Sequence, residues 1–167
     1  MLIVVAGIKR SGSTAQFNMV RIALETAGYK VNIHGQNYKL TGGVDLVKIH
    51  PFDKELADNA DYIFLTDRDN TGIKASLYRF NGAMPTDDRI SRLRANLDMW
   101  KEYKHCMCEF DLLKESPLEC VKKVTGALPF DVDAKYVYEE FEKVKPPKSG
   151  HDRTTLLFHN HITYDHS

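Results

Sequence analysis

LIVVAGIKRSGST, residues 2–14, is the stretch that decides the fold of this chain. Its first five residues, 2–6, are apolar and mostly β-branched, which predicts a buried strand. Gly7 ends that strand, and an apolar-periodic helix opens after the loop. Such a strand–loop–helix unit favours an anion site, because the first N–H groups of the helix have no partners and the helix dipole is positive there. The candidate binding residues of the loop are Lys9, Arg10, Ser11, Gly12, Ser13 and Thr14.

Composition limits the partners of the chain. We expect its 167 residues to form a single domain, residues 1–167, with a real core. Basic and acidic residues both number 23, so the net charge is zero and no overall field draws the chain to nucleic acid or a membrane. The apolar run at 2–6 is too short for a signal peptide or a membrane span. The three cysteines, Cys106, Cys108 and Cys120, are not spaced as a paired zinc site, which favours reduced thiols in a cytoplasmic protein.

Alternating elements predict the architecture. A helix over residues 13–27 is followed by strands at 29–33, 44–49 and 61–66, with a short helix at 53–59 capped by Asp53. This order implies right-handed crossovers and a parallel sheet, that is, a P-loop-type three-layer α/β/α fold. The second half is expected to be helical, with helices that start at Thr86, at a Ser116 capping box and over 131–144.

The loop at residues 7–14 is close to a Walker A sequence without matching it. Gly7 and Gly12 stand at the two glycine positions, but Ser13 stands where a nucleotide triphosphatase has its lysine. The basic residue comes before the second glycine, as Arg10. The order from Arg10 to Thr14 resembles the phosphosulfate-binding loop of sulfotransferases; the alternative is a Gly/Ser turn before an ordinary helix.

Polar residues at the ends of the next strands are the further candidates, since ligands of parallel sheets lie at the carboxyl ends of the strands. Lys48 and His50 stand two apart at the end of a strand and point the same way. Together with Pro51 they resemble the Lys-x-His-x-Pro segment of sulfotransferases, although the proline comes one residue earlier here. In that family the histidine is the general base, which implies this role for His50.

A second pair follows the strand at 61–66. Arg68 comes at the strand end and Ser76 eight residues later, in the next helix. This spacing resembles the sulfotransferase signature that holds the 3′-phosphate of the nucleotide. An arginine fork and a hydroxyl donor suit that ligand, whereas the alternative is a surface arginine and an incidental helix serine.

The tail offers a weaker resemblance. Lys148-Ser149-Gly150 and the run at 160–163, NHIT, stand where sulfotransferases close the cofactor site, but the Arg-Lys-Gly signature is missing. Lys148 and Arg153 are candidates for phosphate contact, and a surface tail is the alternative.

The resemblance covers residues 2–80 and implies an enzyme that transfers a sulfuryl group from 3′-phosphoadenosine 5′-phosphosulfate to a hydroxyl or amine. His50 would act as base, Lys48 would stabilise charge, and no metal would be needed. A small P-loop kinase with Asp67 as magnesium ligand is one alternative. Others are a non-catalytic phosphonucleotide binder and a metal protein built from tail histidines (His151, His159, His161 and His166). The residues do not specify the acceptor or the oligomeric state.

Overall fold

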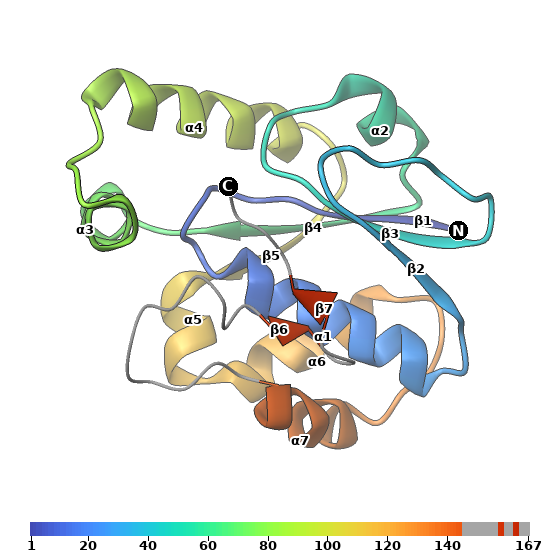
Figure 1. Cartoon of the computed structure of the whole chain (residues 1–167). Coiled ribbons are helices and arrows are strands. Elements are labelled where there is room, and N and C mark those ends of the chain that lie inside the picture. Colours follow the sequence, from blue (N-terminus) through green and yellow to red (C-terminus); the bar gives the residue numbers. More distant parts are fainter. Residues whose placement is uncertain (145–156, 159–161, 164–167) are drawn as a thin grey trace.

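A five-stranded parallel sheet forms the centre of the computed structural model, which describes residues 1–144, 157–158 and 162–163 (Figure 1). The strand order is β2-β3-β1-β4-β5, so β1 is central and the chain continues first to one side of it and later to the other. The carboxyl ends of all five strands therefore meet at one edge. The strands are β1 Leu2–Val5, β2 Val31–His34, β3 Val44–Lys48, β4 Tyr62–Asp67 and β5 Cys106–Glu109.

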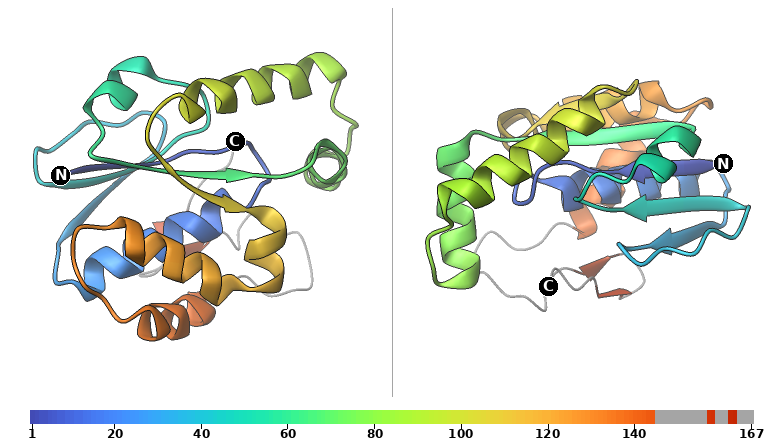
Figure 2. Two further views of the ribbon diagram at one scale, coloured as in Figure 1. Left: turned by 180° about the vertical axis from the view of Figure 1, so that it is seen from behind. Right: turned by 90° about the horizontal axis from the view of Figure 1, so that it is seen from above.

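Helices cover both faces of this sheet. Helices α2 and α4 lie on one face, α1, α5, α6 and α7 lie on the other, and α3 crosses the edge where the strands end (Figures 1 and 2). The helices are α1 Ser13–Thr26, α2 Lys54–Asn59, α3 Asn70–Asn81, α4 Asp87–Lys101, α5 Phe110–Glu115, α6 Pro117–Ala127 and α7 Ala134–Val144. A short antiparallel pair, β6 Leu157–Phe158 and β7 Ile162–Thr163, follows.

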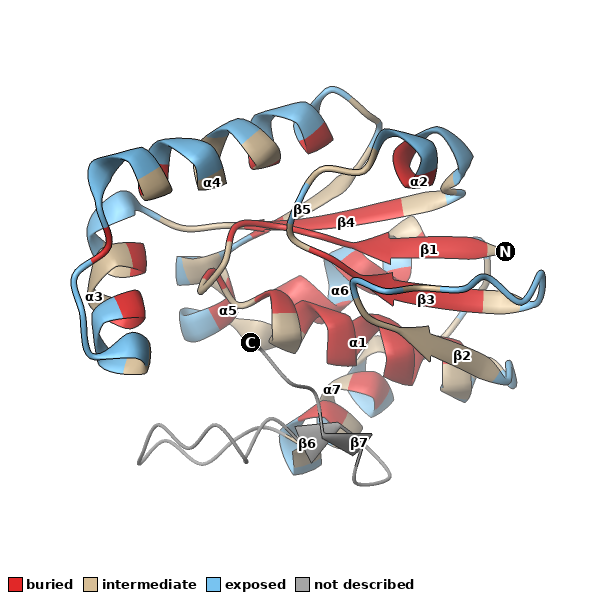
Figure 3. Ribbon diagram, turned by 45° about the horizontal axis from the view of Figure 1, so that its top comes forward, coloured by how far each residue is buried: buried red, intermediate tan, exposed pale blue. Residues whose placement is uncertain are grey.

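The sheet separates two apolar cores. Ile3 and Val5 of β1 face the core shared with α1, α6 and α7, whereas Leu2 and Val4 face the core that contains Trp100 of α4. All of β1 is buried (Figure 3), as expected for a central parallel strand. The predicted α/β class with a parallel sheet is confirmed.

Most helices start where the local sequence predicts, although not every predicted cap forms. The side chains of Asp53 and Thr86 accept hydrogen bonds from the N–H groups of Leu56 and Arg89, as predicted. Helix α6 begins at Pro117 with Ser116 as its N-cap residue, as predicted, but the predicted capping hydrogen bond is wrong, because the Ser116 hydroxyl makes none. The last helix begins at Ala134, three residues later than the sequence predicts.

The strand β5 was not predicted, because the second half of the chain was expected to be helical. Its four residues, CMCE, pair in parallel with residues 64–67 of β4. A four-residue segment with cysteine and glutamate carries little strand signal of its own, so tertiary pairing decides its conformation. This strand adds a fifth strand end to the edge that carries the candidate site.

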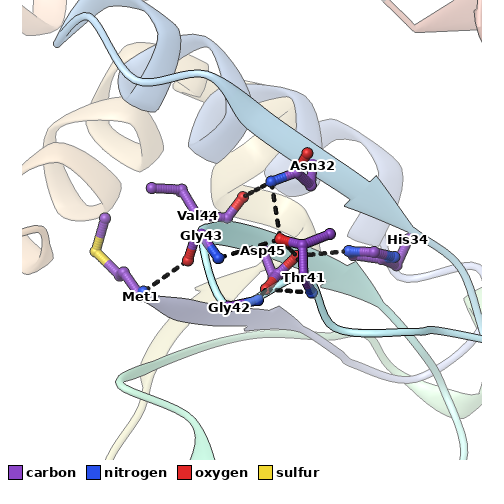
Figure 4. A network of polar contacts seen from close by, with 8 residues as sticks. All are labelled: Met1, Asn32, His34, Thr41, Gly42, Gly43, Val44 and Asp45. Carbon is purple, nitrogen blue, oxygen red and sulfur yellow. Dashed lines mark hydrogen bonds and ion pairs between the residues drawn. The ribbon is translucent and has the colours of Figure 1, made fainter.

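The long connection between β2 and β3 is fixed by one buried carboxylate (Figure 4). Asp45 lies 2.8 Å from His34 Nε2, and it accepts hydrogen bonds from the Thr41 hydroxyl and from the N–H groups of Thr41 and Gly42. Burial would raise the pKa of Asp45, but these hydrogen bonds hold it below its ordinary value. His34 is therefore engaged in holding this connection.

The tail residues named above, Lys148 to Arg153 and the four histidines, lie outside the described residues. Within the described part of the chain, every helix is too short or too polar to cross a bilayer.

Candidate anion site at the carboxyl edge of the sheet

The loop after β1 is locked against β4 by close contacts. Gly7 has a φ of 126°, and a Cβ built there would lie 2.4 Å from the Thr66 hydroxyl and 2.7 Å from the Thr66 nitrogen. Ser11, which is fully buried, has its hydroxyl 2.6 Å from that of Thr66 and 2.5 Å from the Ile8 carbonyl. The Ser11 hydroxyl thus holds the loop, and no residue larger than glycine fits at position 7.

The loop reaches the helix through two left-handed residues. Arg10 has a φ of 67°, the one positive value outside glycine in the described chain, and Gly12 has a φ of 91°. Gly12 is the N-cap of α1 and has no side chain to cap it, while Ser13 and Thr14 form the first turn. Strained backbone of this kind concentrates at ligand sites, and the uncapped helix start presents its N–H groups to the edge.

Arg10 of this loop contacts two other predicted residues, Arg68 and Ser76. Arg10 Nε donates to the Ser76 hydroxyl over 3.0 Å, and Arg68 Nη1 donates to the Arg10 carbonyl over 3.3 Å. Arg68 directly follows β4, and Ser76 lies buried in the second turn of α3. The fold therefore brings together side chains that are 66 residues apart in the sequence.

Two further residues shape the position of Arg68, and sequence reasoning missed both. The Arg68 guanidinium lies 3.7 Å from the centre of the Phe110 ring, a cation–π contact from α5. A Cβ built on Gly72 would lie 2.3 Å from Arg68 Nε, so the glycine lets the side chain lie across the first turn of α3. Glycine within a helix costs about 1 kcal/mol of stability relative to alanine. A glycine in this predicted helix was therefore the one sequence feature that could have indicated a close contact at position 72.

Cations surround the loop and depress one another's pKa values. Burial is the largest cause for Arg10, and Arg68 and Arg79 lower its pKa further. The pKa of Lys9 is lowered by burial and then by Arg89. Positive charges held together in this way favour an anion as their ligand.

Lys48 is a further cation, and it feels the charges of Arg10 and Lys9. Its side chain is fully buried at the end of β3, and burial, Arg10 and Lys9 hold its pKa well below the ordinary value. An anion bound at the loop would stabilise the charged form of this amine and reverse that shift.

His50, two residues after Lys48, is half-buried, and its Nδ1 lies 2.8 Å from the Gly7 carbonyl. A carbonyl can only accept, so in the neutral ring Nδ1 carries the proton and Nε2 carries the lone pair. In the neutral ring, this hydrogen bond therefore selects the tautomer with the lone pair on Nε2.

Asp67, the carboxylate that a magnesium-dependent site would need, is already engaged. It forms ion pairs with Arg94 and with Lys101, the latter at 3.1 Å. Burial would raise the pKa of Asp67, but the hydrogen bonds from Lys101 and Arg94 lower it. Across the described residues, histidines, cysteines and carboxylates form no group of three that could hold a metal ion.

Comparison with known proteins shows which solved structures share the fold of this chain. No protein-family model matches the chain, and no curated protein sequence matches it at a significant level. Among solved structures, mouse sulfotransferase SULT7A1 complexed with PAP is similar with a TM-score of 0.63 and 12% identity, over 98% of this chain and 76% of that one. The chain has the sulfotransferase fold. Retinol dehydratase in a complex with retinol and PAP is also similar, with a TM-score of 0.54 and 12% identity, over 86% of this chain and 64% of that one.

The predicted site residues lie near one edge of the sheet. The loop after β1 and the ends of β3 and β4 lie at the carboxyl edge of the sheet, and α3 crosses that edge (Figure 1). Lys48, His50 and Arg68 lie at or just after these strand ends, and Ser76 lies in α3. Direct contacts link Arg10 to Ser76 and Arg68, and His50 to the loop carbonyl of Gly7. The edge thus gathers two arginines, a serine hydroxyl and a helix start, with a histidine bonded to the same loop.

Proposed function

We propose that this chain is a sulfotransferase that uses 3′-phosphoadenosine 5′-phosphosulfate and modifies a hydroxyl or amine acceptor. The observation that carries the proposal is the meeting of Arg10, Arg68 and Ser76 beside an uncapped helix start. The two solved structures named above are complexes with PAP. A ligand with phosphate groups at two positions suits a cradle with two separate arginines.

In this proposal the two arginines take different parts of the nucleotide. Arg10, the amides of the loop and the hydroxyls of Ser13 and Thr14 would hold the 5′-phosphosulfate at the helix start. Arg68 and Ser76 would hold the 3′-phosphate, with Arg68 aligned by the Phe110 ring. Lys9 adds positive charge at the rim of the same loop.

The residues of β3 would carry the transfer. His50 Nε2 takes the proton of the acceptor as the acceptor oxygen or nitrogen bonds to sulfur, in line with the breaking bond between sulfur and the bridging oxygen. Lys48 and Arg10 stabilise the charge that develops on that bridging oxygen and on the sulfonate. The phosphosulfate supplies the sulfuryl group, and no metal is needed because the cations of the protein neutralise the charge.

The contacts of Asp67 disfavour the kinase alternative, because its carboxylate is ion-paired to α4. A binder without activity would use the same cradle. Such a binder would hold the bisphosphate and modify no acceptor, so turnover distinguishes it from an enzyme.

The experiment that tests the proposal compares adenosine 3′,5′-bisphosphate with AMP by calorimetric titration. The wild type should bind the bisphosphate much more tightly, because only this ligand reaches Arg68 and Ser76. Loss of a charge-assisted hydrogen bond costs about 1.5–3 kcal/mol, so Arg68→Ala should weaken bisphosphate binding about 10- to 150-fold and leave AMP nearly unchanged. Arg92→Ala, an exposed arginine of α4, is the control. Equal affinity of the wild type for both ligands would refute the assignment of Arg68 and Ser76.

A further inference from the structure

A residue of helix α4, Arg94, holds the backbone of Arg68 in place. Asp67 Oδ1 accepts the N–H of Arg68 over 2.7 Å, and the same oxygen is bound by Arg94 Nη1. Arg94 Nη2 donates to the carbonyl of Arg68. Both polar groups of the Arg68 backbone are therefore fixed by one ion pair between β4 and α4.

The guanidinium of Arg94 also reaches the next element. Its Nε donates to Asn70 Oδ1 over 2.7 Å, and Asn70 is the first residue of α3, the helix that carries Ser76. One side chain thus connects the end of β4, the residue after it and the start of α3. Lys101, the last residue of α4, adds a second ion pair to Asp67 Oδ2.

We propose that Arg94 is a positioning residue that fixes Arg68 and the start of α3, and thereby sets the selectivity of the site for a nucleotide with a 3′-phosphate. This inference rests on the proposed function, because it assigns that phosphate to Arg68 and Ser76. Arg94 acts only through these residues: its own donors are directed at Asp67, Arg68 and Asn70.

The side-chain contacts of Arg68 show why its backbone must be held. Its guanidinium stacks on the Phe110 ring and donates to the Arg10 carbonyl, and that carbonyl belongs to the loop that would itself contact the ligand. Arg68 Nε is buried with no hydrogen-bond partner in the described residues. A guanidinium with few polar contacts keeps its direction only if its backbone is fixed, and small displacements at such a site are costly.

An arginine is needed at position 94 because three acceptors lie around one planar group. A lysine has a single ammonium and cannot place donors on Asp67, the Arg68 carbonyl and Asn70 in the same geometry. Arg94→Lys keeps the charge and removes the fork, whereas Arg94→Gln removes both.

The test measures affinity for adenosine 3′,5′-bisphosphate and for AMP in the wild type, Arg94→Gln, Arg94→Lys and the control Arg92→Gln, together with the melting temperature of each. Both Arg94 variants should lower the ratio of the two affinities about tenfold, and the control should keep it within about twofold. A merely structural role would lower the melting temperature and leave the ratio unchanged.

The outcomes separate this inference from the function on which it rests. A wild type that prefers the bisphosphate, with an unchanged ratio in Arg94→Lys and Arg94→Gln, overturns the inference alone. A wild type that does not distinguish the two ligands overturns the proposed function and the inference with it. If Arg94→Gln does not fold, the ratio in Arg94→Lys decides.

Discussion

Replacement of Lys48 by methionine should stabilise the ligand-free protein while it weakens the binding of anions. The Lys48 amine is fully buried, and burial and the charges of Arg10 and Lys9 lower its pKa well below the ordinary value. A lowered pKa means that the charged amine destabilises the fold. Methionine has a similar length and shape, so Lys48→Met removes the charge without leaving a large cavity.

The size of the effect follows from the cost of burial. Transfer of a polar group from water into a protein interior costs about 1–3 kcal/mol by mutational data, so the free energy of unfolding should rise by about that amount. For a chain of this length, each kcal/mol raises the melting temperature by about 2–4 °C. Lys39→Met, at an exposed position in the connection between β2 and β3, is the control and should change little.

The pH dependence of the free energy of unfolding shows whether the charge of Lys48 stabilises or destabilises the fold. Above the lowered pKa of Lys48 and below about 10.4, the unfolded chain binds a proton on this group that the folded chain does not. The wild type therefore gains stability as the pH rises through this window. The advantage of Lys48→Met should be largest below the lowered pKa and should narrow towards high pH, as measured by thermal unfolding. A variant less stable than the wild type at every pH would show that the amine stabilises the fold, and the reasoning would be wrong.

Three further predictions test the loop and the chemistry. Gly7→Ala should lower the free energy of unfolding by roughly 3 kcal/mol or more, since its Cβ meets the backbone of Thr66 at a positive φ; a melting temperature equal to that of the wild type would contradict this. His50→Ala should lower turnover about 10²–10⁴-fold and keep bisphosphate affinity within a few-fold, whereas unchanged turnover would place the base elsewhere. If the wild type binds the bisphosphate but modifies no acceptor, the binder hypothesis replaces the enzyme. Binding of the bisphosphate should be the same in EDTA and in magnesium, and its loss in EDTA would favour the kinase alternative.

The loop and the strand ends of the site could be predicted from the sequence, because short stretches of neighbouring residues determine them. The apolar run before Gly7 and the helix after Gly12 placed the loop, and the short strands put Lys48 and Arg68 at strand ends. All these features depend on residues near one another in the chain, so periodicity and glycine positions suffice to find them.

Local signals could not predict contacts between distant elements. Strand β5 exists because it pairs with β4, and only that pairing brings Phe110 of α5 onto Arg68. Arg94 likewise looks like one more charged residue on an exposed helix until the packing of α4 places it against Asp67. The roles given to the tail residues, among them Lys148 and Arg153, stay predictions because these residues lie outside the described part of the chain.

The most direct test of the central claim is a crystal structure of the wild type grown with adenosine 3′,5′-bisphosphate. We expect the 5′-phosphate at the start of α1, within hydrogen-bond distance of Arg10 and the loop amides. The 3′-phosphate should lie between Arg68 and Ser76, where it replaces the hydrogen bond from Arg10 Nε to the Ser76 hydroxyl. A nucleotide bound away from this edge, or with its 3′-phosphate directed into solvent, would contradict the account.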